Sequence, residues 1–482
     1  MSGDLRAIAP ELVLTILALA LLVVDLLTEP GKKRQVAWTG VAGLVIALFP
    51  SAGLLSVAPR FAFAGTYAID PFAAFFKLVA IGSGILVLLA TMEFFAGRTS
   101  QNEGEIYALI VFMVLGLVLM AAAADLILLF LSIEFVSLVS YVLAGALKGD
   151  RRSNEAGIKY FFYGAAASAV MLYGFTFLYG VSGTTNLYRL MQHVAFLPAG
   201  FLALAVVLVL AGLGFKISLV PFHQWTPDVY EGAPTPITAF LSVGSKAAGF
   251  AALLRVLYVA VPVQGWVTLV AGLAAISMTL GNLVALSQQN IKRMLAYSAI
   301  AHGGYMLIGL VAITASATPV GSGVDALLFY LLAYTFTNIG AFAVAIVIER
   351  ALGSDAIQDY AGLSQRAPFS AVAMAVFMLS LTGIPPTALF FGKLMLFGAA
   401  INSGLLWLAV IGIVNSVISL FYYVGVIQAM WQMAPPEGAR PIPETSLSRT
   451  VLGVAVVATM IIGIFPQPFI RLVNAASIIA RF

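Results

Sequence analysis

The chain has 482 residues, of which 62% are hydrophobic and only 9% are charged, whereas an ordinary soluble domain has roughly 25% charged residues. This composition predicts a membrane protein and excludes a soluble domain of useful size. The net charge of +4 says little by itself, because the placement of the basic residues matters more. Cysteine is absent and histidine occurs three times, so the chain offers no thiolates for an iron–sulfur cluster and no haem ligand set. We therefore do not expect this chain to transfer electrons by itself.

In chain order, runs of about 20 apolar residues are long enough to cross a membrane. Lys32, Lys33 and Arg34 follow the first run, Leu12–Leu27, so we interpret it as a retained helix with its N-terminus outside, not as a signal peptide. The sequence predicts an all-α polytopic membrane protein with about fourteen spans. They are expected at residues 8–27, 36–55, 71–95, 105–123, 125–147, 154–181, 198–220, 236–260, 265–287, 293–313, 325–349, 367–401 (interrupted), 404–430 and 447–470.

The basic residues support this number of spans, because they gather in the loops on one side, as the positive-inside rule requires. The inside loops include Lys32, Lys33, Arg34, Arg98, Lys148, Arg151 and Arg152. The outside segments hold fewer, namely Arg6, Arg60, Arg189, Arg255, Arg471 and Arg481. Lys77 lies within a predicted span but near its end, where we expect its side chain to extend to the membrane surface.

Two predicted spans contain prolines that interrupt a regular helix, at Pro221 and at the pair Pro385-Pro386. A lysine lies close to each interruption, Lys216 and Lys393. Broken helices at matching places predict two inverted repeats with a transport path between them. The alternative is a pair of proline kinks that only shape the bundle.

These repeats divide the chain into four parts. Residues 1–104 would form three N-terminal spans, residues 105–260 the first five-helix repeat and residues 261–430 the second, inverted one. Residues 431–482 would add a loop and the last span.

Five charged side chains are expected inside the membrane, and they are the main candidate functional residues: Glu134, Lys159, Lys216, Lys246 and Lys393. Each would cost about 2.5–3.5 kcal/mol at the centre of a helix, or about 12–17 kcal/mol together, if left unpaired. One carboxylate cannot pair with four lysines. We therefore expect some of the lysines to take up and release protons as a relay, and the alternative is static ion pairing.

Other polar residues give weaker signals. His223 follows the first interruption and His302 lies in a predicted span, so either could bridge lysines through water, although a lone buried histidine is more often only hydrogen-bonded. Asp228 and Glu231 fall in an inside loop and could form a proton entrance.

Three motifs give the sequence a specific resemblance. The segment from Lys216 to Pro236, the run from Gln289 to His302 and the stretch from Leu381 to Lys393 resemble the antiporter-like membrane subunits of respiratory complex I, NADH–quinone oxidoreductase. The resemblance covers the whole chain. Lysine at both 246 and 393 favours the branch of the family called subunit N, because other branches are expected to carry histidine or glutamate there.

The resemblance implies a role for each matching residue. Glu134 and Lys159 would form an ion pair that controls the protonation of Lys216. Lys246 would be the central relay, and Lys393 would pass the proton towards the outside.

The same resemblance implies the partners and the location of the chain. It would lie in the bacterial inner membrane among homologous antiporter-like subunits and small helical subunits, with no nucleic acid. It would bind no cofactor of its own, and NADH, FMN, Fe–S clusters and quinone would be bound by partner subunits, so it would be enzymatic only within the complex. Alternatives are a subunit of a cation/proton antiporter or membrane-bound hydrogenase, and a structural spacer.

Overall fold

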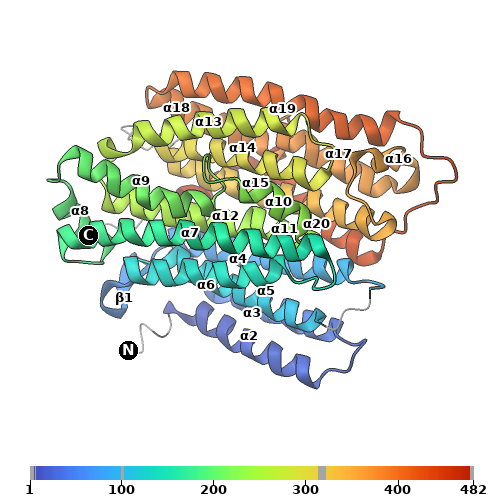
Figure 1. Ribbon diagram of the computed structural model, residues 1–482, viewed down its shortest axis with the longest axis horizontal. Coiled ribbons are helices and arrows are strands. Elements are labelled where there is room, and N and C mark those ends of the chain that lie inside the picture. The colour runs from blue at the N-terminus through green and yellow to red at the C-terminus, as the bar shows by residue number, and fades with distance from the viewer. Residues whose placement is uncertain (1–4, 6, 99–101, 313–321, 478–482) are drawn as a thin grey trace.

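The computed structural model describes residues 5, 7–98, 102–312 and 322–477. Helices lying side by side make up nearly all of this part of the chain (Figure 1). Among the described residues, 13 helices are long and apolar enough to cross a membrane. The interrupted span is formed by two shorter apolar helices, α17 (Pro368–Thr382) and α18 (Ala388–Asn402). The predicted all-α polytopic fold is confirmed. The division into inverted repeats stays a prediction.

The N-terminal group begins at one edge of the bundle and ends inside it (Figure 1). It contains α2 (Ala9–Leu27), α3 (Arg34–Gly53), η1 (Leu54–Ser56), β1 (Arg60–Ala62), η2 (Phe63–Gly65), β2 (Tyr67–Ile69) and α4 (Pro71–Phe94). The two strands pair antiparallel, with Arg60 opposite Ile69. Asp70 caps α4, because its carboxylate accepts a hydrogen bond from the amide of Ala73.

The middle of the chain includes the first interrupted helix. Its elements are α5 (Glu103–Ala122), α6 (Leu126–Ala144), α7 (Arg151–Ser182), α8 (Leu187–Val194), α9 (Ala199–Lys216), α10 (Trp225–Gly232), α11 (Thr235–Phe240), η3 (Leu241–Ser245), α12 (Lys246–Leu254) and η4 (Arg255–Ala260). The segments η3 and η4 are π-helical turns that continue α11 and α12 as one span. The chain between α5 and α6 is extended at Ala123, and Asp125 caps α6, so two separate helices meet there as expected.

The remaining elements reach the opposite edge, where α18 and α19 lie (Figure 1). They are η5 (Val263–Gly265), α13 (Val267–Ala285), α14 (Ile291–Val311), α15 (Gly323–Leu352), η6 (Ile357–Tyr360), α16 (Leu363–Arg366), α17, α18, α19 (Leu406–Gln432), α20 (Ser446–Ile464) and α21 (Pro466–Ala476). The last predicted span is therefore too long. Pro466 starts a new helix, because proline cannot donate a backbone hydrogen bond within a continuing one.

Burial is greatest in the middle of the bundle. Every residue of the 18-residue apolar stretch within the span Thr235–Ala260 is buried. In the edge helices α2, α3 and α19, only 33% of the corresponding residues are buried. The edge helices expose large apolar side chains such as Ile16, Phe49 and Phe421, as expected of surfaces that face lipid or partner subunits.

The prediction for Lys77 is wrong. Lys77 lies about 9 Å into α4 at 1.5 Å per residue and its side chain is 1% exposed, because it forms an ion pair with Glu11. Arg255 lies at the outside end of its span, as predicted, but it is 0% exposed directly after α12, where Asp70 pairs with it. Arg6, Arg481 and residue 313 of an expected span lie outside the described residues. We call the end of the bundle that includes Lys33 the inner end and the opposite one the outer end.

Candidate functional site

Three of the five predicted charged residues lie deep in the bundle. The exposed fractions of Lys216, Lys246 and Lys393 are 2%, 1% and 5%. Each ammonium group donates hydrogen bonds to uncharged oxygen atoms. Across the part of the chain that the structure describes, none of the three forms an ion pair with a carboxylate.

The first interruption places Lys216 at the carboxyl end of α9, where the helix dipole favours a cation. Ser218 follows in the left-handed region at φ 62°, which turns the chain away from the helix axis. The protein itself satisfies the backbone groups that the turn frees. The Phe215 carbonyl accepts a hydrogen bond from the Trp225 indole at 3.1 Å, and the Val220 amide donates to Ser277 of α13 at 3.1 Å.

Glu134 lies next to Lys216 rather than next to Lys159. The Lys216 ammonium donates to the Ser137 hydroxyl at 3.1 Å, one helical turn from Glu134 on α6, and the charge of Glu134 acts on Lys216. One carboxylate oxygen of Glu134 is buried without a hydrogen-bond partner. A buried polar atom of this kind usually binds a water molecule or holds a proton.

Lys159 has different partners from those that the family resemblance implies. Its ammonium binds Asp228 at 2.6 Å and Glu155 at 2.7 Å, and its side chain is 38% exposed. The expected pair with Glu134 is absent among the described residues. The reason is position: Lys159 lies only two turns from the inner end of α7, and α10 brings Asp228 to it there.

This inner end contains a charged pocket of about 250 Å³. Asp228 accepts hydrogen bonds from Lys159 and from Arg293, and Arg293 also binds Glu231 at 2.8 Å. Burial alone would raise the pKa of the Asp228 carboxyl, but the hydrogen bonds from Lys159 and Arg293 outweigh it, so the pKa lies below its ordinary value. Asp228 and Glu231 thus lie in one water-accessible cluster, as the proton-entrance hypothesis requires.

Lys246 begins α12, directly after the π-helical turn η3. Its ammonium donates a hydrogen bond to the Ala299 carbonyl of α14. Gly303 lies close to this contact, since a Cβ there would be 3.6 Å from the Lys246 nitrogen, in ordinary contact, and a tighter 3.2 Å from the Ile217 carbonyl. Ser242, in η3, accepts a hydrogen bond from Asn338 of α15 at 2.6 Å.

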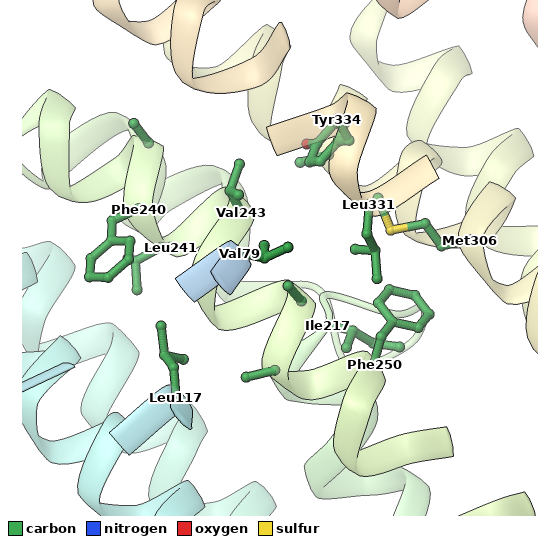
Figure 2. Close-up of a cluster of buried hydrophobic side chains, with 14 of the residues drawn as sticks. Val79, Leu117, Ile217, Phe240, Leu241, Val243, Phe250, Met306, Leu331 and Tyr334 are labelled. Carbon is green, nitrogen blue, oxygen red and sulfur yellow. The ribbon is translucent and has the colours of Figure 1, made fainter. Parts of the chain in front are cut away.

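An apolar layer fills the centre of the bundle around this turn. Figure 2 shows Val243 of η3 close to Val79 of α4, with Ile217 of the first interruption below them and Tyr334 of α15 above. These side chains are buried. The polar groups next to this layer are therefore surrounded by close-packed apolar side chains, where charges interact strongly.

His302 lies between Lys246 and Lys393, and the charges of both lysines act on it. One ring nitrogen is 2.6 Å from the Tyr330 hydroxyl and the other is 3.1 Å from the Tyr423 hydroxyl. Tyr423 in turn is 2.5 Å from Ser298. These contacts form an unbroken chain of groups that can both donate and accept protons.

The second interruption binds Lys393 directly. Its ammonium donates to the carbonyls of Leu381 (3.1 Å) and Thr382 (2.7 Å), the last residues of α17. Gly383 has a φ of 90°, and a Cβ there would lie 2.8 Å from Lys393 Cδ. The ammonium also lies over the ring of Tyr305, 4.8 Å from its centre.

The remaining predicted residue, His223, lies in the first interruption with one ring nitrogen buried and unpartnered. The structure does not bring His223 and His302 together by any hydrogen bond among the described residues. Sequence reasoning missed Tyr330, Tyr423 and Arg293 as members of the site. No signal could have found the tyrosines, since aromatic residues in a span are ordinary core residues.

Within the described ranges, no three His, Cys, Asp or Glu side chains gather where they could hold a metal ion. A bundle of membrane-spanning helices with two interrupted helices and a buried lysine at each belongs to the architectural class of secondary transporters and related membrane subunits.

Comparison with known proteins narrows this class. Residues 123–419 match the family described as NADH:quinone oxidoreductase/Mrp antiporter, TM. NADH-quinone oxidoreductase subunit N 2 of Chloroherpeton thalassium is 43% identical, over 96% of this chain and 92% of that protein. Respiratory complex I from Thermus thermophilus with bound aureothin contains a chain with a TM-score of 0.82 and 35% identity, covering 97% of this chain and 99% of that one.

A chain of the archaeal membrane-bound sulfane sulfur reductase has a TM-score of 0.87 at 26% identity, covering 98% of this chain and 97% of that chain. The chain therefore belongs to the NADH:quinone oxidoreductase and Mrp antiporter family, in the branch of subunit N. The resemblance inferred from the sequence motifs is confirmed.

Proposed function

We propose that this chain moves protons across the bacterial inner membrane as the N-type membrane subunit of NADH–quinone oxidoreductase. One observation carries the proposal: three buried lysines, at the two interruptions and between them, bind only uncharged oxygen atoms among the described residues. A buried ammonium without a carboxylate is expensive in hydrocarbon, so such a lysine can exist in both protonation states. If the chain were only a structural spacer, its buried charges would be expected to form ion pairs.

The contacts support a route in two stages. In the first stage a proton enters at the inner pocket of Asp228, Lys159 and Glu231, and reaches Lys216 beside Glu134. A change in the charge of the Lys159–Asp228 pair acts on the next group by electrostatics, which is strong in a low-dielectric interior.

In the second stage the proton passes from Lys246 through the chain of Tyr330, His302 and Tyr423 towards Lys393. Lys393 releases it towards the outer end along α18. An ammonium or imidazolium loses one proton and the next lysine or histidine gains one. A tyrosine between them accepts a proton on its oxygen while it releases its own hydroxyl proton, so the net charge is unchanged.

The opposite chain directions of the two interrupted helices support the proposed repeats, residues 105–260 and 261–430. Helix α9 enters from the outer end and is interrupted before α10, whereas α17 enters from the inner end and is interrupted before α18. We place residues 1–104 and 431–482 outside the repeats, as N-terminal and C-terminal additions.

We further propose that the redox chemistry is done by partner subunits. NADH, FMN, Fe–S clusters and quinone would be bound there, and this chain would bind no cofactor. Its partners would be homologous antiporter-like subunits and small helical subunits, which fits the exposed apolar side chains of α2, α3 and α19.

Ion measurements test the proposal against its relatives. Inverted membrane vesicles with the assembled complex should take up protons when NADH is added, and uptake should be independent of sodium. The Lys246→Ala variant should lose most of this uptake. Sodium-dependent transport would favour a cation/proton antiporter instead, and full uptake after loss of both Lys216 and Lys246 would favour a structural spacer.

A further inference from the structure

A second group of buried charges lies at the outer end, apart from the three buried lysines of the candidate site. Arg255 is 0% exposed and follows α12, nine residues after Lys246 on the same span. The transport route does not use it, because a guanidinium does not release its proton at physiological pH.

Arg255 binds three different elements at once. Its Nε donates to the Ala121 carbonyl of α5 at 2.9 Å, and one terminal nitrogen donates to the Tyr188 hydroxyl of α8 at 2.8 Å. The other terminal nitrogen donates to Asp70, the cap of α4, at 2.8 Å. The planar guanidinium fixes all of these directions together.

The span that includes Lys246 needs such a fixed point. Helix α12 has a π-helical turn at each end, η3 before Lys246 and η4 from Arg255 onward. Such turns are rare and occur frequently at functional sites. If one of them reverts to α-helical spacing, the residues beyond it turn by about 100° and move by about 1.5 Å. The regular α-helical ladder therefore does not hold the register of Lys246 at either end.

Side chains hold that register instead. At the inner end, Asn338 donates a hydrogen bond to Ser242 of η3, and at the outer end Arg255 binds α4, α5 and α8. A one-residue slip would remove the Lys246 ammonium from the Ala299 carbonyl that it now binds.

We propose that Arg255 is a positioning residue that sets the register of α12 and so aims Lys246 at α14. Its importance for transport rests on the proposed function, in which Lys246 is a relay. Its effect on register does not.

The test uses a cross-link that reports register directly. The chain has no cysteine, so the pair Ser242→Cys and Asn338→Cys is unique in it. In an otherwise unchanged chain within the complex, oxidation should join the two cysteines. Arg255→Met with Asp70→Asn removes both charges while the asparagine still caps α4, and it should lower the cross-link yield several-fold.

A neighbouring buried ion pair provides the matched control. Lys77 and Glu11, 2.8 Å apart, join α4 to α2, and their side chains hydrogen-bond to Tyr67, not to Arg255. Lys77→Met with Glu11→Gln should leave the yield unchanged. An unchanged yield in the Arg255 variant, or an equal fall in the control, would overturn the proposal.

Two further measurements complete the design. If Arg255→Met does not assemble, Arg255→Lys keeps the charge but loses two of the three contacts, and the cross-link yield should still fall. Proton uptake per NADH, without the cysteines, should fall in the Arg255 variants and not in the control. If Lys246→Ala leaves uptake intact while the cross-link behaves as expected, the proposed function fails and the register proposal stands.

Discussion

At the scale of single residues, backbone carbonyl groups position two of the three buried lysines. Lys393 binds two carbonyls because α17 ends at them, and Gly383 leaves the space through which its side chain passes. Lys246 donates to the Ala299 carbonyl of α14, and Gly303 lies beside its ammonium group. Backbone oxygen atoms hold a lysine in place without neutralising it, which suits a group that must change its charge.

Gly383→Ala should therefore disturb Lys393 specifically. The new methyl group would meet Lys393 Cδ at 2.8 Å and the backbone would keep a φ of 90°, so the variant should lose about 1–3 kcal/mol of stability and most of its proton uptake. Gly398→Ala is the control. Gly398 lies on α18, the helix of Lys393, and a Cβ added at Gly398 would meet no neighbouring atom within 4 Å. Equal uptake in the two variants would contradict this account of Lys393.

The pH dependence of the inner pocket follows from Asp228. Hydrogen bonds from Lys159 and Arg293 hold its pKa below the ordinary value of 3.8, against the effect of burial. Its ion pairs are thus fully formed above about pH 4 and are lost as the pH falls through the lowered pKa. The stability difference between wild type and Asp228→Asn, followed by thermal unfolding, should be constant from pH 8 to pH 5. A difference that already declines between pH 7 and pH 6 would show that Asp228 is not held ionised.

At the scale of elements, the first interrupted helix is stabilised by contacts from outside itself. The Val220 amide is satisfied by Ser277 of α13, and Trp225 satisfies the carbonyl of Phe215. A helix interrupted in hydrocarbon can exist only where neighbouring protein supplies such partners.

Ser277→Ala should thus destabilise the interruption. It leaves a buried amide without a partner and should cost about 1–3 kcal/mol, measured by thermal unfolding of the assembled complex. Ser287→Ala is a suitable control, because the Ser287 hydroxyl is exposed and bonds only within its own turn. If both variants unfold at the same temperature, water rather than Ser277 satisfies Val220.

The sequence predicted most of the elements, because apolar length and proline placement are local properties. It predicted the interruptions and the burial of Lys216, Lys246 and Lys393. It failed where a partner from a distant segment decides the outcome. Lys159 pairs with Asp228 and not with Glu134, and Lys77 is buried because it pairs with Glu11. The π-helical turns around α12 have no sequence signature, and so the role of Arg255 could be inferred only from contacts.

At the scale of the whole molecule, the polar groups of the proposed route follow one line through a close-packed bundle. The line begins at the charged inner pocket, passes the two interruptions and reaches α18 near the opposite edge (Figure 1). Buried apolar side chains such as Val79 and Val243 pack together at the centre of the bundle (Figure 2). In the proposed route protons cross by way of groups that change charge, so removing one such group should stop the whole route.

The most direct test is a paired measurement on Lys216→Ala. NADH–quinone electron transfer and proton uptake into sealed vesicles are compared with wild type, after assembly has been confirmed, with the exposed Lys148→Ala as control. The account predicts that both rates fall together, by about tenfold or more, because an obligatory proton-transfer group is missing. If electron transfer and proton uptake both persist, the buried lysines are structural and the proposed mechanism is wrong.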